Sequence, residues 1–298
     1  MSVDLRRRGL LAASLAAAVA LPAWRALAGP VSTAETPLDA LSRLEARHGG
    51  RLGVAILDTA DGRRINHRGE ERFLMCSTFK WLLAAHALAR VDAGEESLDA
   101  LVVINADDLV FHSPVTEAHV DTGMTVAALC EAAVTRSDNA AANLLLARQG
   151  GPAGFTAFAR SIGDDWTRLD RIEPGLNVPS PDGLLDTTTP AAMLRDLQTV
   201  LLGDVLQPVS RDRLVGWLAG NRTGDARLRA GMPATWRIGD KTGTGGDGPA
   251  NDVGIAWPPG RAPLLVTAYY ENVDADPAQR DALIADVGRI AAGLVVRA

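Results

Sequence analysis

The sequence has few of the cysteines and histidines that hold zinc or close disulfides. The 298 residues include only two cysteines, Cys76 and Cys130, and five histidines without metal-ligand spacing, which argues against a zinc site. No glycine-rich phosphate loop follows a strand pattern. The formal net charge is −6, so the chain has no electrostatic footprint for nucleic acid. We therefore expect a protein that works without a metal, a cofactor or a nucleic-acid partner.

The composition is that of a globular protein. Hydrophobic residues make up 47% of the chain and charged residues 22%. A chain of this length can bury a sizeable core, either in one large domain or in two interleaved ones. No internal repeat and no low-complexity tract interrupts the pattern.

The N-terminus has the features of an export signal. Three arginines at positions 6–8 precede a largely apolar run, residues 9–21, that is too short to span a bilayer comfortably. Ala26-Leu27-Ala28 offers a small-x-small cleavage site, and the residues from Arg7 to Leu11 resemble a twin-arginine signal. An uncleaved anchor is the alternative. We expect residues 1–28 to be a cleaved signal and the protein to be periplasmic, with no stable membrane association after cleavage.

Hydrophobic periodicity predicts an alternation of strands and helices. Strands are predicted near the two ends of the chain, at 51–58, 63–67, 236–240, 252–257 and 263–270. Helices are predicted at 37–48, 82–91, 126–134, 140–147, 155–162, 190–202 and 277–295. The stretch from Leu169 to Thr188 is broken by prolines and glycines and predicts a long ordered loop.

This order of elements predicts an α+β architecture. An antiparallel sheet built from both ends of the chain would be flanked by helices, with an all-α region inserted between its halves. We place the α/β domain at 36–68 and 213–298, and the all-α domain at 69–212, including loop 169–187. The seam between the two is the natural place for a cleft.

Ser77-Thr78-Phe79-Lys80 is the first pattern that carries chemistry. On a helix, residues three apart lie on one face, with Cβ atoms about 5–6 Å apart. A serine hydroxyl is a poor nucleophile until a neighbour takes its proton, and a lysine can do so only if burial and nearby charge keep it partly neutral. The pattern predicts covalent acyl transfer without a histidine, although it also occurs by chance on surface helices.

Two further patterns are weak alone. Ser137-Asp138-Asn139 lies between two predicted helices, where its hydroxyl could relay a proton and its amide could hold a carbonyl. A simple helix cap is the alternative. Lys241-Thr242-Gly243-Thr244 follows a strand pattern and could bind a carboxylate beside a closely approaching backbone. An edge strand with a turn is the alternative.

The long loop carries a third pattern. Glu173 and Asn177 are four apart, so a carboxylate and an amide could hold one water between them, with Glu173 as general base. A solvated acidic loop is the alternative. Arg171 and Asp186 bracket this segment, and a salt bridge between them could close the loop.

Together these patterns resemble a known set. Ser-x-x-Lys, Ser-Asp-Asn and Lys-Thr-Gly in this order are typical of class A β-lactamases and penicillin-binding proteins. The chain also resembles class A β-lactamases in residues 113–117 (Ser-Pro-Val-Thr-Glu), in residues 221–224 (Asn-Arg-Thr-Gly) and in the loop with Glu173 and Asn177. The resemblance covers essentially the whole chain after the signal, and it implies a serine β-lactamase/DD-peptidase-like fold.

The resemblance implies roles in catalysis. Ser77 would be the acylated nucleophile, and the base for acylation would be Lys80 or Glu173 acting through a water. Glu173 and Asn177 would hold the water that removes the acyl group. Ser137 would pass a proton to the lactam nitrogen. The backbone N–H groups of Ser77 and Thr244 would form the oxyanion hole.

The resemblance also implies substrate contacts. Asn139 would contact the side-chain amide of the substrate, and Lys241 with Thr242 would meet its carboxylate. The full set of expected binding positions is His112, Asn139, Arg227, Lys241, Thr242 and Gly243. By similarity, the Glu173–Pro174 bond would be cis.

Three positions depart from the family pattern. His112 stands where relatives usually carry a larger aromatic. Cys76 precedes the nucleophile as in some carbapenem-hydrolysing relatives, but the position of its partner is Gly245 here. The usual partner position of Cys130 is Ala84. We therefore expect two free, buried thiols.

The resemblance implies an enzyme that hydrolyses penicillins and cephalosporins through an acyl-enzyme and so confers antibiotic resistance. It would act on this small-molecule substrate as a monomer, without a cofactor. One alternative is a penicillin-binding DD-peptidase, which would lack the deacylating pair Glu173 and Asn177. The other is a β-lactam sensor domain, which is acylated and stays acylated. The sequence leaves the substrate spectrum open, because cleft contacts shift discrimination by only about 1–3 kcal/mol.

Overall fold

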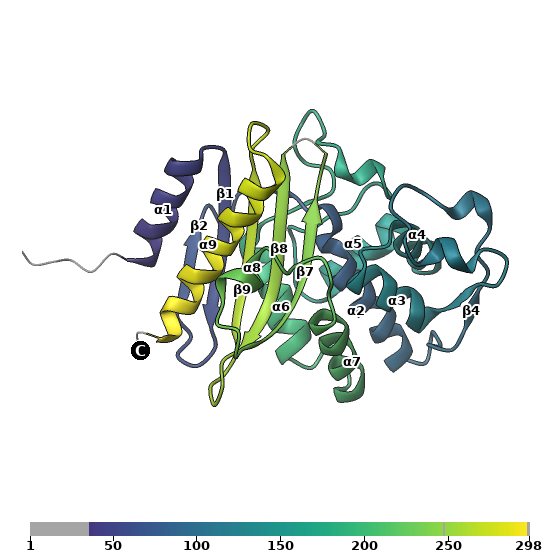
Figure 1. Ribbon diagram of the computed structural model, residues 1–298. Helices are drawn as coiled ribbons and strands as arrows, with labels where there is room; N and C mark the ends of the chain where they lie inside the picture. The colour runs from purple at the N-terminus through teal and green to yellow at the C-terminus, as the bar shows by residue number, and fades with distance from the viewer. Residues whose placement is uncertain (1–35, 247, 297–298) are drawn as a thin grey trace, which may run out of the picture. The chain divides into compact units, whose positions relative to one another are not determined.

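A five-stranded antiparallel sheet forms the frame of the protein. The computed structural model describes residues 36–246 and 248–296. The strands lie in the order β2-β1-β9-β8-β7 (Figure 1). Their bounds are Arg51–Asp58 (β1), Arg64–His67 (β2), Arg237–Thr244 (β7), Pro249–Trp257 (β8) and Leu264–Glu271 (β9). The predicted fold class, with a sheet drawn from both ends of the chain, is confirmed.

The pairing of β1 with β9 joins these two parts of the chain. Arg51 lies opposite Glu271 and Asp58 lies opposite Leu264, so the two strands pair along their whole length. Three of the predicted strand regions, near 236–240, 252–257 and 263–270, are β7, β8 and β9. β7 runs four residues further than predicted and so includes the whole Lys-Thr-Gly-Thr segment.

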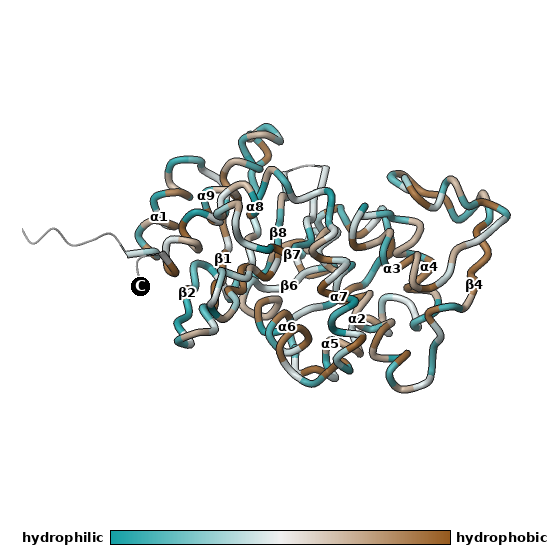
Figure 2. Tube along the Cα trace, turned by 60° about the horizontal axis from the view of Figure 1, so that its bottom comes forward, coloured by the Kyte–Doolittle hydropathy of each residue, from teal (hydrophilic) through white to brown (hydrophobic). Residues whose placement is uncertain are grey.

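The two faces of the sheet bury different side chains because residues alternate along a strand. Val54 and Ile56 belong to a cluster with Leu283 of helix α9 (Pro277–Val296), and α1 (Pro37–His48) packs on the same side. Ala55 and Leu57 belong to a second cluster, beneath helix α6 (Pro190–Leu202). The trace of α6 alternates between brown and teal in Figure 2, as expected for a helix with one buried face.

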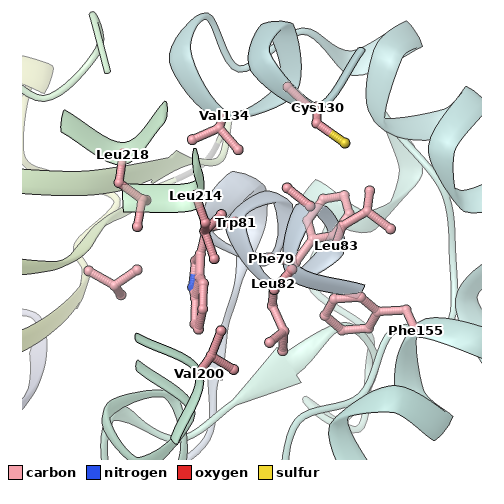
Figure 3. Close-up of a cluster of buried hydrophobic side chains, with 14 of the residues drawn as sticks. Phe79, Trp81, Leu82, Leu83, Cys130, Val134, Phe155, Val200, Leu214 and Leu218 are labelled. Carbon is pink, nitrogen blue, oxygen red and sulfur yellow. The ribbon is translucent and has the colours of Figure 1, made fainter. Parts of the chain in front are cut away.

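Helix α2 (Phe79–Asp92) runs through the centre of the second cluster. Its side chains from Phe79 to Leu88 are buried on every side, except that of His86, which is partly exposed. In Figure 3, Trp81 is flanked by Val200 of α6 and by Leu214. The surrounding helices are α3 (Val126–Thr135), α4 (Asn139–Arg148), α5 (Gly151–Ser161) and α7 (Pro208–Ala219).

All seven predicted helices are present; α1 and α6 have the predicted ends, and the other five differ at one end or both. Two helices were not predicted, α7 and the single turn α8 (Leu228–Gly231). Two pairs of two-residue strands were not predicted either: β3 (Phe73–Leu74) with β6 (Thr187–Thr188), and β4 (Leu101–Val102) with β5 (Met124–Thr125). The division into two domains stays a prediction, and its boundary at 212 falls within α7.

The expected signal at residues 1–28 lies outside the described residues. Within residues 36–246 and 248–296, no helix has both the length and the apolar character needed to cross a membrane. Cys76 and Cys130 are both free and buried, as predicted.

Candidate active site

Ser77 lies on a tight turn that β7 approaches closely. The turn, η1 (Cys76–Thr78), comes directly before α2, and its buried Cys76 has a φ of 45°, which few non-glycine residues adopt. A Cβ atom at Gly243 would lie 2.6 Å from the carbonyl oxygen of Met75. Only glycine at this position lets the strand pack against the turn that carries the serine.

Glu173 lies between the serine and the lysine of the first pattern. Its Oε1 accepts a hydrogen bond from Ser77 Oγ at 3.3 Å and lies 2.9 Å from Lys80 Nζ. The side chains of Lys80 and Glu173 are both 0% exposed. The loop carboxylate therefore joins the Ser77 hydroxyl to the buried ammonium group.

Lys80 has three acceptors around its Nζ. Besides Glu173, the nitrogen donates to the carbonyl oxygen of Ser137 at 2.8 Å and to Asn139 Oδ1 at 2.5 Å. Burial lowers the pKa of Lys80, and the charge of Glu173 opposes that shift. Three acceptors match the three donors of a protonated amine, so the geometry fits an ammonium in the free protein.

The backbone of Glu173 is held by a side chain of α4. Asn143 Nδ2 donates to the Glu173 carbonyl oxygen at 2.9 Å, and the Glu173 N–H donates to Asn143 Oδ1 at 2.9 Å. The Glu173–Pro174 bond is cis, as predicted. Asn143 thus fixes the position from which the carboxylate reaches the serine.

The predicted salt bridge closes the base of the loop. Arg171 Nε donates to Asp186 Oδ2 at 2.6 Å, and the carboxylate of Asp186 is fully buried. Asp186 Oδ1 also accepts the backbone N–H groups of Asp170 and Arg171, at 2.8 and 2.9 Å. These bonds hold both ends of the loop together.

Asn177 completes the loop's contribution. Its Nδ2 donates to Glu173 Oε2 at 2.5 Å, whereas its Oδ1 is buried without a hydrogen-bond partner among the described residues. An unpaired buried acceptor beside a carboxylate is a suitable place for an ordered water.

Asp138 anchors the Ser-Asp-Asn turn to the segment at 113–117. Its fully buried carboxylate accepts the N–H groups of Val115 and Thr116, the Thr116 hydroxyl and, as N-cap of α4, the N–H of Ala141. Two motifs separated in the sequence are therefore one structural unit. The anchoring sets the direction of the neighbouring Ser137, whose φ is 57°.

Lys241 brings a second buried amine to the site. Its Nζ donates to Ser137 Oγ at 3.0 Å and to the carbonyl oxygen of Thr242 at 2.8 Å. Burial and the charge of Lys80 lower the pKa of Lys241 to about 7, against the opposing effect of Asp240 and Asp252. Lys80 and Lys241 are the only two lysines in the whole sequence.

Arg227 holds the end of β7. Its NH2 donates to Thr244 Oγ1 at 2.8 Å, and its NH1 donates to the carbonyl oxygens of Gly243 and Asn251, each at 2.8 Å. Its Nε is paired with Asp281 at 2.7 Å. Since most of its donors are used within the protein, Arg227 supplies positive charge and orients the Thr244 hydroxyl.

These groups surround one cavity of about 530 Å³. Eight of the predicted site residues line it: Ser77, His112, Ser137, Asn139, Asn177, Arg227, Thr242 and Thr244. A second cavity, of about 480 Å³, lies between loop residues 179–187 and the end of β9, and none of the predicted site residues lines it. The chemistry-bearing side chains therefore converge on the first cavity.

Comparison with known proteins identifies the family. The family model described as "Beta-lactamase enzyme family" matches residues 36–295. A solved structure, an ancestral (GNCA) class A β-lactamase, is 62% identical with a TM-score of 0.85, covering 88% of this chain and 99% of that one. The chain belongs to the class A β-lactamases. β-Lactamase L2 of Stenotrophomonas maltophilia is 47% identical over 290 residues, 95% of this chain and 96% of the relative. The carbapenem-hydrolysing β-lactamase KPC of Klebsiella oxytoca is 47% identical over 268 residues, 89% and 92% of the two chains.

The remaining predicted site residues lie behind the wall of this β-lactamase cavity. Lys80, Glu173 and Lys241 are buried and reach it through the hydrogen bonds described above. Gly243 acts through its backbone. His112 is exposed at the rim, with φ 61° and its Nε2 3.2 Å from the carbonyl oxygen of Arg136.

Three residues of the site were missed by sequence reasoning. Asn143 follows Asn139 by one helical turn, a spacing that would have revealed it. Thr223, whose Oγ1 lies 2.5 Å from Thr242 Oγ1, stands in a quoted motif but had no assigned role. Phe111 is 84% exposed and lines the cavity. Nothing in the sequence distinguishes it from a core aromatic.

Proposed function

We propose that this enzyme hydrolyses the β-lactam amide of penicillins and cephalosporins through an acyl-enzyme on Ser77, and so confers antibiotic resistance. The observation that carries the proposal is the position of Glu173. One of its oxygens contacts Ser77 and Lys80, and the other contacts Asn177. A serine that is only acylated needs no such carboxylate, whereas a serine that is deacylated by water does.

In acylation, Ser77 Oγ attacks the lactam carbonyl carbon and the C–N bond of the ring breaks. Glu173 is the better candidate for the base, because its Oε1 already accepts the serine hydroxyl. Lys80 has all three donors of an ammonium occupied by acceptors, so it has no lone pair to offer in this arrangement. Its charge holds the carboxylate in place.

The departing lactam nitrogen needs a proton. Ser137 Oγ lies within hydrogen-bond distance of Lys241 Nζ and borders the cavity. The hydroxyl can give its proton to the nitrogen and regain one from the neighbouring amine, whose pKa of about 7 suits transfer in either direction.

Deacylation uses the pair formed by Glu173 and Asn177. Before deacylation, Glu173 releases the proton that it took from Ser77, and Lys241 recovers the proton that it gave to Ser137, so the protons balance. A water between the carboxylate and the unpaired Asn177 Oδ1 would then lose a proton to Glu173 and attack the ester carbonyl. The ester C–O bond then breaks, and Ser77 regains its proton. The backbone N–H groups of Ser77 and Thr244 are our candidates for the oxyanion hole, where one donor contributes about 2.7–4 kcal/mol.

Recognition of the substrate uses the opposite wall. The Thr242 hydroxyl and the charge of Lys241 would bind its carboxylate, with Arg227 acting through Thr244. Asn139 Nδ2 donates one hydrogen to the carbonyl oxygen of Phe111, which leaves its second hydrogen for the side-chain amide of the substrate. We also propose export to the periplasm by the twin-arginine route, from the arginine pair at positions 7 and 8.

Steady-state hydrolysis of a chromogenic cephalosporin tests this function. We expect many turnovers per enzyme molecule and none from Ser77→Ala. A stoichiometric burst without turnover would instead indicate a DD-peptidase or a sensor domain, and would refute the deacylating role of Glu173 and Asn177.

A further inference from the structure

A polar groove, separate from the two cavities described above, lies along helix α5. It has a volume of about 730 Å³, and we call it the arginine groove because Arg72, Arg160 and Arg168 line it. Residues of one face of α5, including Ala153 and Ala157, form its floor. Asp165 and Asp170 are the acidic residues of the lining.

Two of the three guanidinium groups have no carboxylate partner. Arg72 donates only to neutral oxygens, the carbonyl of Trp166 at 2.9 Å and the hydroxyl of Thr187 at 3.0 Å. Arg160 donates only to the carbonyl oxygens of Asp164 and Thr167, at 2.5 and 2.7 Å. Among the described residues, neither arginine forms an ion pair.

The third arginine, Arg168, forms an ion pair with Asp170. Arg168 binds Asp170 through two nitrogens, with Nε 2.9 Å from Oδ2 and NH2 2.5 Å from Oδ1. Burial and the charges of Arg168 and Arg160 lower the pKa of Arg72, and the charges of Asp164 and Asp170 oppose that shift. The lining thus carries three arginines against two aspartates, in a chain whose formal net charge is −6.

We propose that the arginine groove binds a phosphate-type oxyanion, which Arg72 and Arg160 hold together. A guanidinium offers donors in a planar fork that matches two oxygens of one anion, and an oxyanion would neutralise both unpaired groups at once. None of the predicted site residues lines this groove. The same chemistry is offered by free phosphate and by the phosphate of a lipid headgroup.

The groove adjoins the catalytic loop. Arg72 donates to the Thr187 hydroxyl, and the Arg168 N–H donates to the Thr187 carbonyl oxygen at 3.0 Å. Thr187 follows Asp186, which closes the base of the loop. An anion that fixes Arg72 would therefore stabilise the folded protein at this point by mass action.

The test is the Tm of the full-length protein against inorganic phosphate, with sodium chloride at equal ionic strength as reference. We expect a saturable rise in Tm. Arg72→Gln and Arg160→Gln should each raise the half-saturating phosphate concentration about tenfold or more, since each removes a charged hydrogen-bond donor. Asp165→Asn should lower that concentration, because it removes a repulsive charge.

Arg213→Gln is the matched control. It removes one exposed arginine from α7 and should leave the phosphate response unchanged. The readout is the response to phosphate within each variant, so a lower starting Tm does not obscure it. If Arg72→Gln fails to fold, the phosphate response of Arg160→Gln and Asp165→Asn still tests the proposal.

Three results would overturn the proposal. The first is no rise beyond that in chloride. The second is an undiminished rise in Tm in the Arg72 and Arg160 variants. The third is a rise in Tm that is lost because phosphate and substrate compete for one site, which would place phosphate in the catalytic cavity. Co-sedimentation with phosphatidylglycerol vesicles, against phosphatidylcholine, distinguishes the sources. Binding to the first alone, lost in the same variants, would assign the site to a lipid headgroup.

Discussion

Replacement of Asn143 tests how the loop carboxylate is positioned. In Asn143→Ala, the N–H and the carbonyl oxygen of Glu173 lose their partners, both at 2.9 Å. Each hydrogen bond contributes about 1 kcal/mol net, so we expect a loss of about 2 kcal/mol. This corresponds to a fall in Tm of about 4–8 °C for a protein of this size.

The same loss should appear in catalysis. If the displaced Glu173 must be restored to its position in the transition state, about 2 kcal/mol corresponds to a fall in kcat of about thirtyfold. Because the hydrolytic water depends on Glu173 and Asn177, we also expect a larger acylated fraction at steady state. Steady-state kinetics on a penicillin and intact-mass measurement check both.

Asn105→Ala is the control for the removal of an amide side chain. Asn105 caps an exposed turn, η2 (Ala106–Asp108), and should leave kcat unchanged. A lower Tm in Asn143→Ala with an unchanged kcat and acylated fraction would show that Asn143 supports the fold alone, and would refute the reasoning.

Three further variants test the site. Glu173→Ala should accumulate acyl-enzyme on a penicillin, as measured by intact mass. Loss of the carboxylate removes the charge that raises the pKa of Lys80, so this amine can act as the base for acylation, but nothing replaces the group that deacylates. Full turnover by this variant would contradict the prediction. Arg171→Ala should lower the free energy of unfolding, measured in urea, by about 3–5 kcal/mol, because the Asp186 carboxylate is left buried without its charged partner. The double variant Arg171→Ala/Asp186→Asn should recover most of this loss. KM for an anionic β-lactam should rise as pH rises through about 7, where Lys241 loses its charge, and Lys241→Arg should flatten the profile. An unchanged pH profile in that variant would exclude Lys241 as its source.

The residues of the site could be predicted where a motif holds them together in sequence. Ser77 and Lys80 are one helical turn apart, and Ser137, Asp138 and Asn139 are consecutive residues between two predicted helices. Thr223 meets Thr242 only because α7 returns the chain to the edge of β7. Such an encounter depends on tertiary packing, which the local pattern does not specify.

The missed elements have a similar cause. The buried positions of α7, namely Ser210, Leu214, Trp217 and Leu218, follow a helical spacing, but the apolar ones gather in its second half. The two-residue strands β3 and β6 exist only because they pair with each other, across more than a hundred residues of chain. No periodicity can develop over two residues, so they could not be predicted from the sequence.

The lysine count is the signal that would have located the site before any motif. The 30 basic residues of the chain include only two lysines, and both are buried and donate hydrogen bonds to Ser137. Arginine serves wherever a permanent charge is enough, as in the pairs at Asp186 and Asp281. A lysine amine, which can lose its proton, is needed only where a proton is exchanged or where the charge of the amine is tuned. Burial lowers the pKa of both lysines. In this chain we therefore expect the two lysines to serve in proton transfer and charge tuning, whereas arginine serves in ion pairs and, through Arg227, beside the substrate.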